Sequence, residues 1–299
     1  MIRIRELVKT FGRSRAVDGV SIDIAEGQSV ALWGGNGAGK TTIIRCVLGL
    51  FRFGGTIEVG GLDVRRSGKR ARRLIGYVPQ ELGFYDELRA AEAVRFFARL
   101  KGLRSRNEGE ALGHVGLVGH EHKRVRELSG GMKQRLALAI ALLGDPPILI
   151  LDEVTASLDA CGRDELVQLL SRLSRGGRTM LFASHRVEEV SSLANRVVML
   201  ERGRAVGECG VESFMPRLGL STLLHLHIVE SARVEAMTTL RAHGFAPRLN
   251  GVGLMVPVPA EQKAAPFRVL AQARIAVDDF ELIRASEVGG VHPTQEVAS

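Results

Sequence analysis

A glycine-rich run constrains this sequence more than any other feature: Gly34-Gly35-Asn36-Gly37-Ala38-Gly39-Lys40-Thr41. The run follows a short apolar segment, 29–33, that reads as a strand, and it precedes a segment, 41–50, that reads as a helix. The spacing G-x4-G-K-[ST] at such a turn is the pattern of a phosphate-binding loop, because its glycines let successive backbone N–H groups point at one anion. A plain glycine turn is the alternative, and the flanking strand and helix favour the phosphate-binding loop.

This loop predicts how a nucleotide is held. Lys40 would reach the β- and γ-phosphates, and the hydroxyl of Thr41 would hold Mg²⁺. We therefore expect ATP and Mg²⁺ as the bound cofactors. The residues expected to contact the nucleotide are Gly34, Gly35, Asn36, Gly37, Ala38, Gly39, Lys40, Thr41 and Thr42.

A second apolar run, Ile148-Leu149-Ile150-Leu151, ends in the two carboxylates of Asp152 and Glu153. Ligands of open α/β sheets bind at the carboxyl ends of the strands, where this pair would lie. We expect Asp152 to orient Mg²⁺ and Glu153 to polarise the attacking water as general base. The alternative is an ordinary pair of acidic residues in a loop or at a helix cap.

The chain is predicted to have two domains. Residues 1–212 alternate short β-type runs with helical stretches, which indicates an α/β domain with a largely parallel sheet. The pattern breaks near 211–219, where Pro216 and two glycines interrupt it. Residues 220–287 read as strand, helix, hairpin around Asn250-Gly251, helix and strand, which predicts a small α+β domain of split βαβ type. We expect residues 288–299 to form a disordered tail.

Composition and charge indicate the cellular compartment and the kinds of partner to expect. None of the apolar runs reaches the roughly 18 to 20 residues of a spanning helix, and the N-terminus lacks the apolar core of a secretion signal, so we expect a cytoplasmic chain. The three cysteines are scattered singly and are expected to be inert packing residues. The net charge of +8 includes a basic cluster, 65–73, without interleaved aromatic residues, so no nucleic acid is expected as a partner.

The run Leu128-Ser129-Gly130-Gly131-Met132-Lys133-Gln134-Arg135 resembles the LSGGQ signature of ATP-binding-cassette (ABC) ATPases. Ser129, Gly130 and Gly131 would open a helix to about 143 and create a second anion-binding helix terminus. The resemblance implies a P-loop NTPase fold of ABC type, with a helical subdomain at about 81–143. It also implies that the signature contacts the γ-phosphate held by a second copy of the ATPase subunit.

Further motifs follow in the order of that family. The resemblance implies that Phe11 stacks on adenine, that Gln80 is the Q-loop glutamine near the metal and the attacking water, and that Asp159 belongs to the D-loop. It also implies that His185 is the switch histidine of the catalytic site. Val154 departs from the pattern, because the family usually has proline after the catalytic glutamate, but the change removes no chemical group.

The resemblance implies an ATPase that couples hydrolysis to transport through separate membrane-spanning permease subunits, at the cytoplasmic face of the inner (plasma) membrane. The alternative is a soluble ABC ATPase acting on ribosomes or nucleic acid. Such proteins resemble two fused cassettes or carry long coiled coils, whereas this chain has one cassette and only about 48 residues between Gln80 and Ser129.

Within transporters, the stretches 81–88 and 96–103 and the C-terminal extension resemble ABC-2 type exporters. In length the chain also resembles the copper-processing ATPases of nitrous-oxide-reductase maturation. His225 and His227 share one face of an expected strand. They would form either part of a metal-sensing site or, as we expect, a solvated strand face, because two residues are an incomplete ligand set.

Overall fold

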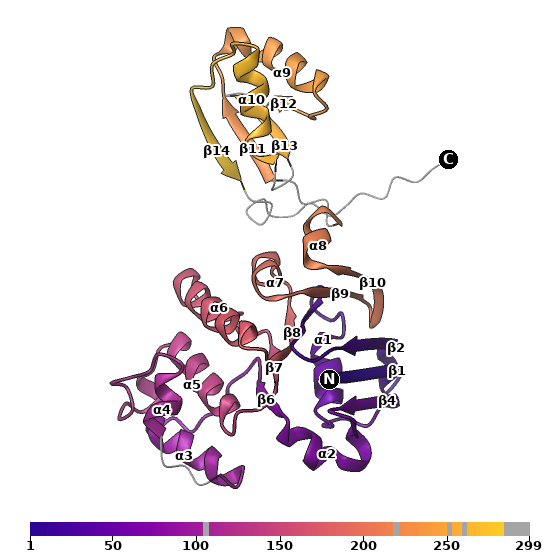
Figure 1. Cartoon of the computed structure of the whole chain (residues 1–299), viewed down its shortest axis with the longest axis vertical. Coiled ribbons are helices and arrows are strands. Elements are labelled where there is room, and N and C mark those ends of the chain that lie inside the picture. The colour runs from indigo at the N-terminus through magenta and orange to yellow at the C-terminus, as the bar shows by residue number, and fades with distance from the viewer. Residues whose placement is uncertain (104–107, 218–221, 250–252, 259–261, 284–299) are drawn as a thin grey trace. The chain divides into compact units, whose positions relative to one another are not determined.

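The computed structural model describes residues 1–103, 108–217, 222–249, 253–258 and 262–283. The chain divides into two compact units, Met1–Glu212 and Ser213–Ser299. The first unit holds two sheets and most of the helices, and the second holds a third sheet (Figure 1).

The larger sheet of the first unit has six strands in the order β10-β9-β3-β8-β7-β6. Neighbouring strands are parallel except for the antiparallel edge pair of β9 and β10, as the sequence predicts for the main sheet. The strands β3, β7 and β8 are buried along almost their whole length, which explains their continuous apolar sequences. The bounds are β3 Ser29–Trp33, β6 Ile75–Val78, β7 Ile148–Asp152, β8 Thr179–Ser184, β9 Arg196–Glu201 and β10 Arg204–Gly210.

A second, antiparallel sheet is made of strands that lie on both sides of the phosphate-binding loop in the sequence. The sequence pattern did not distinguish this sheet from the parallel one. Its strands lie in the order β2-β1-β4-β5. Alternating burial of Ile2 and Ile4 with exposed Arg3 and Arg5 on β1 is the pattern of a sheet with one covered face. The bounds are β1 Ile2–Phe11, β2 Ser14–Ile24, β4 Gly54–Val59 and β5 Leu62–Asp63.

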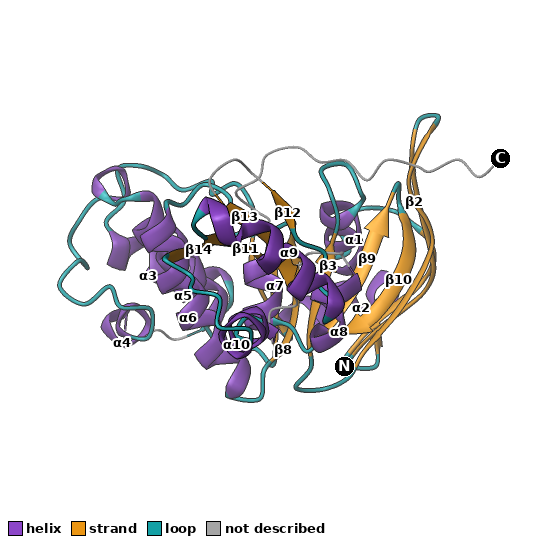
Figure 2. Cartoon of the chain, turned by 90° about the horizontal axis from the view of Figure 1, so that it is seen from above, coloured by secondary structure: helices purple, strands orange, loops and turns teal. Residues whose placement is uncertain are grey.

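The helices of the first unit fall into two groups. Three of the described helices lie between β6 and β7 in sequence, within the stretch expected to form a helical subdomain, and at the opposite end of the unit from the antiparallel sheet (Figures 1 and 2). Their bounds are α3 Ala90–Leu100, α4 Glu108–Gly113 and α5 Gly130–Leu142. The others are α1 Lys40–Val47, α2 Val64–Arg73, α6 Ala160–Arg175 and α7 Val187–Leu193. The basic cluster lies on α2, and its arginines and lysine are exposed.

The C-terminal unit has a four-stranded antiparallel sheet in the order β12-β13-β11-β14, which is the order of a split βαβ arrangement. Apolar residues of β11 and β13, such as Leu226 and Val256, alternate onto one face and form a core with Leu240 of α9 and Leu270 of α10. The bounds are β11 Thr222–His227, α9 Arg233–Ala242, β12 Arg248–Leu249, β13 Gly253–Val258, α10 Ala265–Gln272 and β14 Asp279–Ile283. The hairpin residues Asn250 and Gly251 and the expected tail 288–299 lie outside the described residues.

The boundary between the two units, after Glu212, lies within the predicted break near 211–219. That break also contains a helix that the sequence did not indicate, α8, Val211–Arg217, in which the fully buried Phe214 precedes Pro216 near the end of the helix. One expectation about the cysteines is wrong. Cys161 is exposed and is not a packing residue, whereas Cys46 and Cys209 are buried as expected. Among the described residues, no helix is both long enough and apolar enough to span a membrane.

Candidate functional site

The phosphate-binding loop joins β3 to α1, and two of its glycines are required by their surroundings. A Cβ on Gly34 would lie 2.4 Å from the carbonyl oxygen of Leu200. Gly39, the N-cap of α1, has a φ of 103°, and a Cβ there would lie 2.7 Å from the carbonyl oxygen of Ala16. The loop is thus held between β9 and β2, and Lys40, Thr41 and Thr42 form the first turn of α1.

Lys40 is buried among oxygen atoms. Its ammonium group donates to the carbonyl oxygens of Gly34, at 2.6 Å, and Gly35, at 3.0 Å. It also forms an ion pair with Glu153, with 3.0 Å between Nζ and Oε1, and both side chains are at least nine-tenths buried. A buried ammonium is stabilised only by such close partners, and phosphate oxygens are of the same kind. The structure therefore brings the predicted phosphate-binding lysine and the predicted general base into contact.

Thr41 and Asp152 meet at the carboxyl end of β7. The Thr41 hydroxyl donates to Oδ1 of Asp152 at 2.9 Å. The other carboxylate oxygen, Oδ2, is buried and has no hydrogen-bond partner among the described residues. Burial raises the pKa of Asp152, and the hydrogen bond from Thr41 opposes that shift. A hydroxyl beside a carboxylate with an unpartnered oxygen is a donor set of the hard type that Mg²⁺ prefers, so these residues fit the predicted metal.

Glu153 has an unusual backbone conformation that the sequence did not indicate. Its φ of 48° lies in the left-handed region, which costs free energy for a residue other than glycine. Two backbone hydrogen bonds hold it there: its N–H donates to the carbonyl oxygen of Ala183, and its own carbonyl oxygen accepts from Ala156. The carboxylate lies between Lys40 and His185, whose Nδ1 is 3.4 Å from Oε2.

A buried carboxylate on α7, that of Glu189, is a further part of this site. It accepts hydrogen bonds from the hydroxyls of Thr155 and Ser184, the latter at 2.6 Å. Thr155 follows Glu153 by two residues, and Ser184 directly precedes His185. Glu189 therefore connects, through hydrogen bonds, the two segments that carry the predicted base and the predicted switch histidine. A helix carboxylate carries no local sequence signal for such a role.

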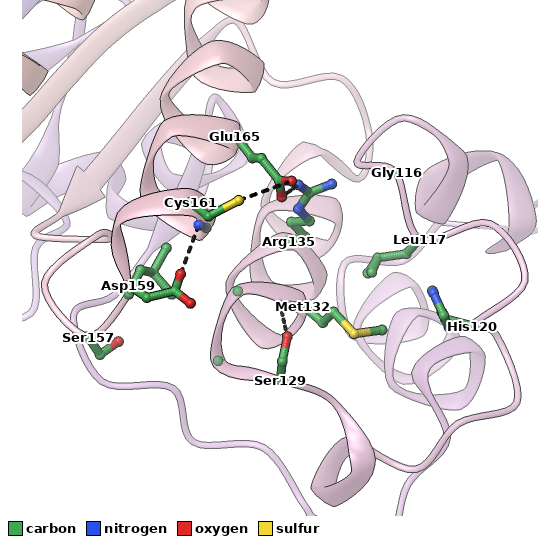
Figure 3. Close-up of a pocket in the computed structure, with 14 residues that line it drawn as sticks. Gly116, Leu117, His120, Ser129, Met132, Arg135, Ser157, Asp159, Cys161 and Glu165 are labelled. Atoms are coloured by element: carbon green, nitrogen blue, oxygen red, sulfur yellow. Dashed lines mark hydrogen bonds and ion pairs between the residues drawn. The ribbon is translucent and has the colours of Figure 1, made fainter.

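Ser129 and Asp159 line one hollow of about 620 Å³, which is separate from the site of Lys40 and Glu153 (Figure 3). Each caps a helix: Ser129 Oγ accepts from Met132 N at 3.3 Å on α5, and Asp159 Oδ1 accepts from Gly162 N at 2.8 Å on α6. The hollow is lined by the first residues of the signature from Ser129 to Met132, by the loop before α6, and by residues of 116–120, α5 and α6, and no residue of the phosphate-binding loop lines it. Gly130 and Gly131 lie on its wall and form the first turn of α5.

The remaining two predicted residues occupy exposed positions. Phe11 ends β1 with 46% of its surface exposed, packs edge-on against Phe51 at 5.3 Å, and has the ammonium of Lys9 4.5 Å from its ring centroid. Gln80 is exposed two residues after β6, whose last residue pairs with Leu151 of β7. Because β6 and β7 are parallel, Gln80 leaves the sheet at the edge that carries Asp152.

Sequence comparison relates the chain to ABC transporters. Residues 17–156 match the family model described as "ABC transporter". The linearmycin resistance ATP-binding protein LnrL of Bacillus subtilis is 32% identical over 267 residues, which is 87% of this chain and 86% of that protein. The daunorubicin resistance ATP-binding protein DrrA3 of Streptomyces coeruleorubidus is 37% identical over 284 residues, or 92% and 90% of the two chains.

Solved structures agree with the sequence matches. The dimeric bacterial ABC transporter cassette MJ0796 superposes with a TM-score of 0.64 at 26% identity, over 71% of this chain and 99% of that one. The same cassette in a post-hydrolysis state with ADP and phosphate gives 0.64 at 25% identity, over 71% and 99%. With a phosphate-binding loop, an acidic pair and a signature run on this fold, the chain belongs to the ATP-binding subunits of ABC transporters and is an ATPase of that family.

Proposed function

We propose that this chain is the energy-coupling subunit of an exporter, acting as a head-to-tail dimer with a second copy and bound to separate membrane-spanning subunits. The observation that carries the proposal is the division of the nucleotide-binding residues into two places. Lys40 and Glu153 lie together at the main sheet, whereas Ser129 and Asp159 line a separate hollow. A second copy turned head to tail would bring the two halves to one nucleotide.

In the first half, each side chain has a chemical task that its position supports. Lys40 would exchange its present oxygen partners for the β- and γ-phosphates of ATP. Glu153, released from Lys40, would accept a proton from the attacking water, and His185 lies against its other oxygen. Phe11 presents an exposed ring for stacking on adenine, already packed against Phe51.

We assign the metal position of this half to Thr41 and Asp152, with Gln80 at the same sheet edge. A bound Mg²⁺ would neutralise charge that develops on the phosphates during hydrolysis. The ion needs the ionised carboxylate, whereas burial favours the protonated one. Mg²⁺ binding should therefore weaken as the pH falls.

In the second half, the N-terminus of α5 would receive the γ-phosphate held by the other copy. The N–H groups of Gly130 and Gly131 lie in the first turn of this 13-residue helix, where its dipole favours an anion. Ser129 adds a hydroxyl at the rim of the hollow. The solved relative MJ0796 is dimeric, which supports a second copy as the partner.

The exporter role rests on the relatives and on the helical subdomain. LnrL and DrrA3 are named as linearmycin and daunorubicin resistance ATP-binding proteins, which favours export of a small toxic compound and gives no support to copper processing or to action on ribosomes or nucleic acid. The subdomain exposes large apolar side chains on and near α3, among them Tyr85, Phe96 and Leu100. Such side chains suit docking to a membrane-spanning partner at the cytoplasmic face.

Replacing Glu189 by alanine is expected to lower both stability and turnover. The hydroxyls of Thr155 and Ser184 lose a buried acceptor, so the free energy of unfolding should fall by about 1–3 kcal/mol in a denaturant titration. ATP hydrolysis should fall more than ATP binding, because the loops of Glu153 and His185 lose their shared support. The control is Glu188→Ala, an exposed carboxylate on the same helix. Equal effects of the two changes would remove the role of Glu189.

Replacing Gln80 by alanine tests the coupling role. The isolated chain should hydrolyse ATP slowly, and reconstitution with its membrane-spanning partner should accelerate hydrolysis. The amide of Gln80 can bond to the metal or the attacking water in one position and withdraw in another, so its loop is suited to a two-state element. Gln80→Ala should therefore reduce the acceleration more than it reduces ATP binding by the isolated chain.

The measurement is the ATPase rate at saturating Mg-ATP, with and without the membrane partner. Glu81→Ala, at the exposed neighbouring position, serves as the control and should keep full stimulation. A Gln80→Ala protein that is stimulated as strongly as the control contradicts the coupling role. Stimulation by ribosomes or DNA in place of the membrane partner contradicts the proposed function as a whole.

A further inference from the structure

The C-terminal unit contains a cluster of metal-ligating side chains that has no part in ATP hydrolysis. His225 and His227 alternate along β11 and therefore project from the same face of the sheet, with their ring centroids 4.3 Å apart. Glu281 of β14 lies directly opposite His225 in the strand register. Its Oε2 is 3.9 Å from Nδ1 of His225.

The cluster occupies a different face from the apolar core of the unit. Leu224 and Leu226, which alternate with the histidines on β11, pack with α9 and α10 in the core. The face that carries the histidines is therefore the face that these helices do not cover. Met255, opposite His225 on β13, is half-buried there. A polar cluster on this face needs a reason other than core packing.

Ring atoms of both histidines are buried. The His225 side chain is only 10% exposed. The Nε2 atom of His227 is buried and has no hydrogen-bond partner among the described residues. A buried ring nitrogen without a partner costs free energy, and a bound metal ion removes that cost by accepting its lone pair. Glu281 is exposed, so its carboxylate has the freedom to close on an ion.

We propose that His225, His227 and Glu281 bind one divalent transition-metal ion, of which Zn²⁺ is the representative. One ligand atom from each residue lies within 4.8 Å of the others. Bonds to zinc of about 2.0–2.2 Å require these atoms to approach a little further, which side-chain rotation of Glu281 and His227 can supply. A water molecule would complete a four-coordinate site.

The donor set selects the class of ion. Two imidazole nitrogens favour zinc and its first-row neighbours, whereas Ca²⁺ and Mg²⁺ prefer sites made of oxygen atoms. The ion would join the central strand β11 to the edge strand β14, since β14 pairs with β11. It would stabilise the C-terminal unit and leave the nucleotide site chemically unchanged.

Zinc titration of the purified full chain tests the proposal. The chain is freed of metal with a chelator and titrated with Zn²⁺ against a chromophoric competitor, and Co²⁺ substitution then reports the ligands through its absorption spectrum. We expect one tight Zn²⁺ per chain, lost in His227→Ala and at least about tenfold weaker in Glu281→Gln. The Co²⁺ spectrum should change in Glu281→Gln.

Two matched variants exclude other zinc ligands. Cys161→Ser removes the exposed thiol, and His243→Ala removes an exposed histidine of the same unit. Both should bind Zn²⁺ as the unchanged chain does. Glu281→Gln alters an exposed side chain, so it should keep its circular dichroism spectrum and its Mg-ATPase rate. Binding that survives in both His227→Ala and Glu281→Gln, or that is lost only in Cys161→Ser, overturns the proposal. So does a chain that binds no zinc and contains only a His225–Glu281 ion pair.

Discussion

Glu153→Gln is expected to slow ATP hydrolysis by about 10² to 10⁴-fold, because the amide cannot accept a proton from water. Glu153 sits 3.0 Å from Lys40 and 3.4 Å from His185, in a backbone conformation held by two hydrogen bonds. Glutamine has nearly the same shape, so the pocket should keep its geometry. ATP binding should therefore survive, and the variant should accumulate as an ATP-bound dimer.

Phosphate release and molecular mass, both with Mg-ATP, measure these two effects. Glu26→Gln, an exposed carboxylate in the turn between β2 and β3, is the control and should hydrolyse ATP at the unchanged rate. A Glu153→Gln chain with nearly unchanged turnover would mean that another group is the general base.

Ser129→Arg is expected to abolish hydrolysis while ATP binding remains. The arginine side chain would cover the start of α5 within the hollow, so the N–H groups of this helix could not stabilise the γ-phosphate held by the other copy. Loss of such preorganised donors costs on the order of 10²-fold in rate or more. Lys40 and Thr41 belong to the other half of the site, so their contacts with ATP should persist.

Binding of a fluorescent ATP analogue and phosphate release separate the two effects. Ser129 also caps α5, so its loss costs about 1 kcal/mol, and thermal unfolding verifies that the variant is folded. Thr238→Arg, at an exposed position of α9, is the control for added charge and bulk. If affinity and turnover fell together in a folded variant, the signature would act within its own chain.

The elements that the sequence predicted best are those that neighbouring residues determine. The strand at 29–33 has the predicted bounds, because a buried parallel strand is a continuous apolar run that ends where glycines begin. The antiparallel sheet was missed because its central pairing, between β1 and β4, spans the phosphate-binding loop and α1 and is therefore not local. The helix at 211–217 was missed because Pro216 and the glycines outweighed Phe214, whose burial is a tertiary fact.

Some residues of the candidate site are likewise marked by the local sequence, and others are not. Lys40, Asp152 and Glu153 were found because fixed spacing and a preceding strand mark them, and the resemblance to ABC ATPases added His185 and Ser129. The role of Glu189 was invisible, because its partner Thr155 is 34 residues away and the contact depends on how α7 packs. The sequence places His225 and His227 on one face of a strand but predicts a solvated face, because Glu281 joins them only through the strand register.

Mixing two inactive variants tests whether each nucleotide site is completed by two chains. Lys40→Ala removes the ammonium of the phosphate-binding loop but keeps its signature, whereas Ser129→Arg blocks the signature but keeps its loop. In a mixed dimer, the loop of the Ser129→Arg chain meets the intact signature of the Lys40→Ala chain.

The measurement is phosphate release by each variant alone and by the mixture, at equal total protein and saturating Mg-ATP, with mixed dimers verified by mass. We expect that neither variant hydrolyses ATP alone and that the mixture regains part of the activity. A mixture that forms mixed dimers but stays as inactive as its components would contradict a nucleotide site shared between two chains.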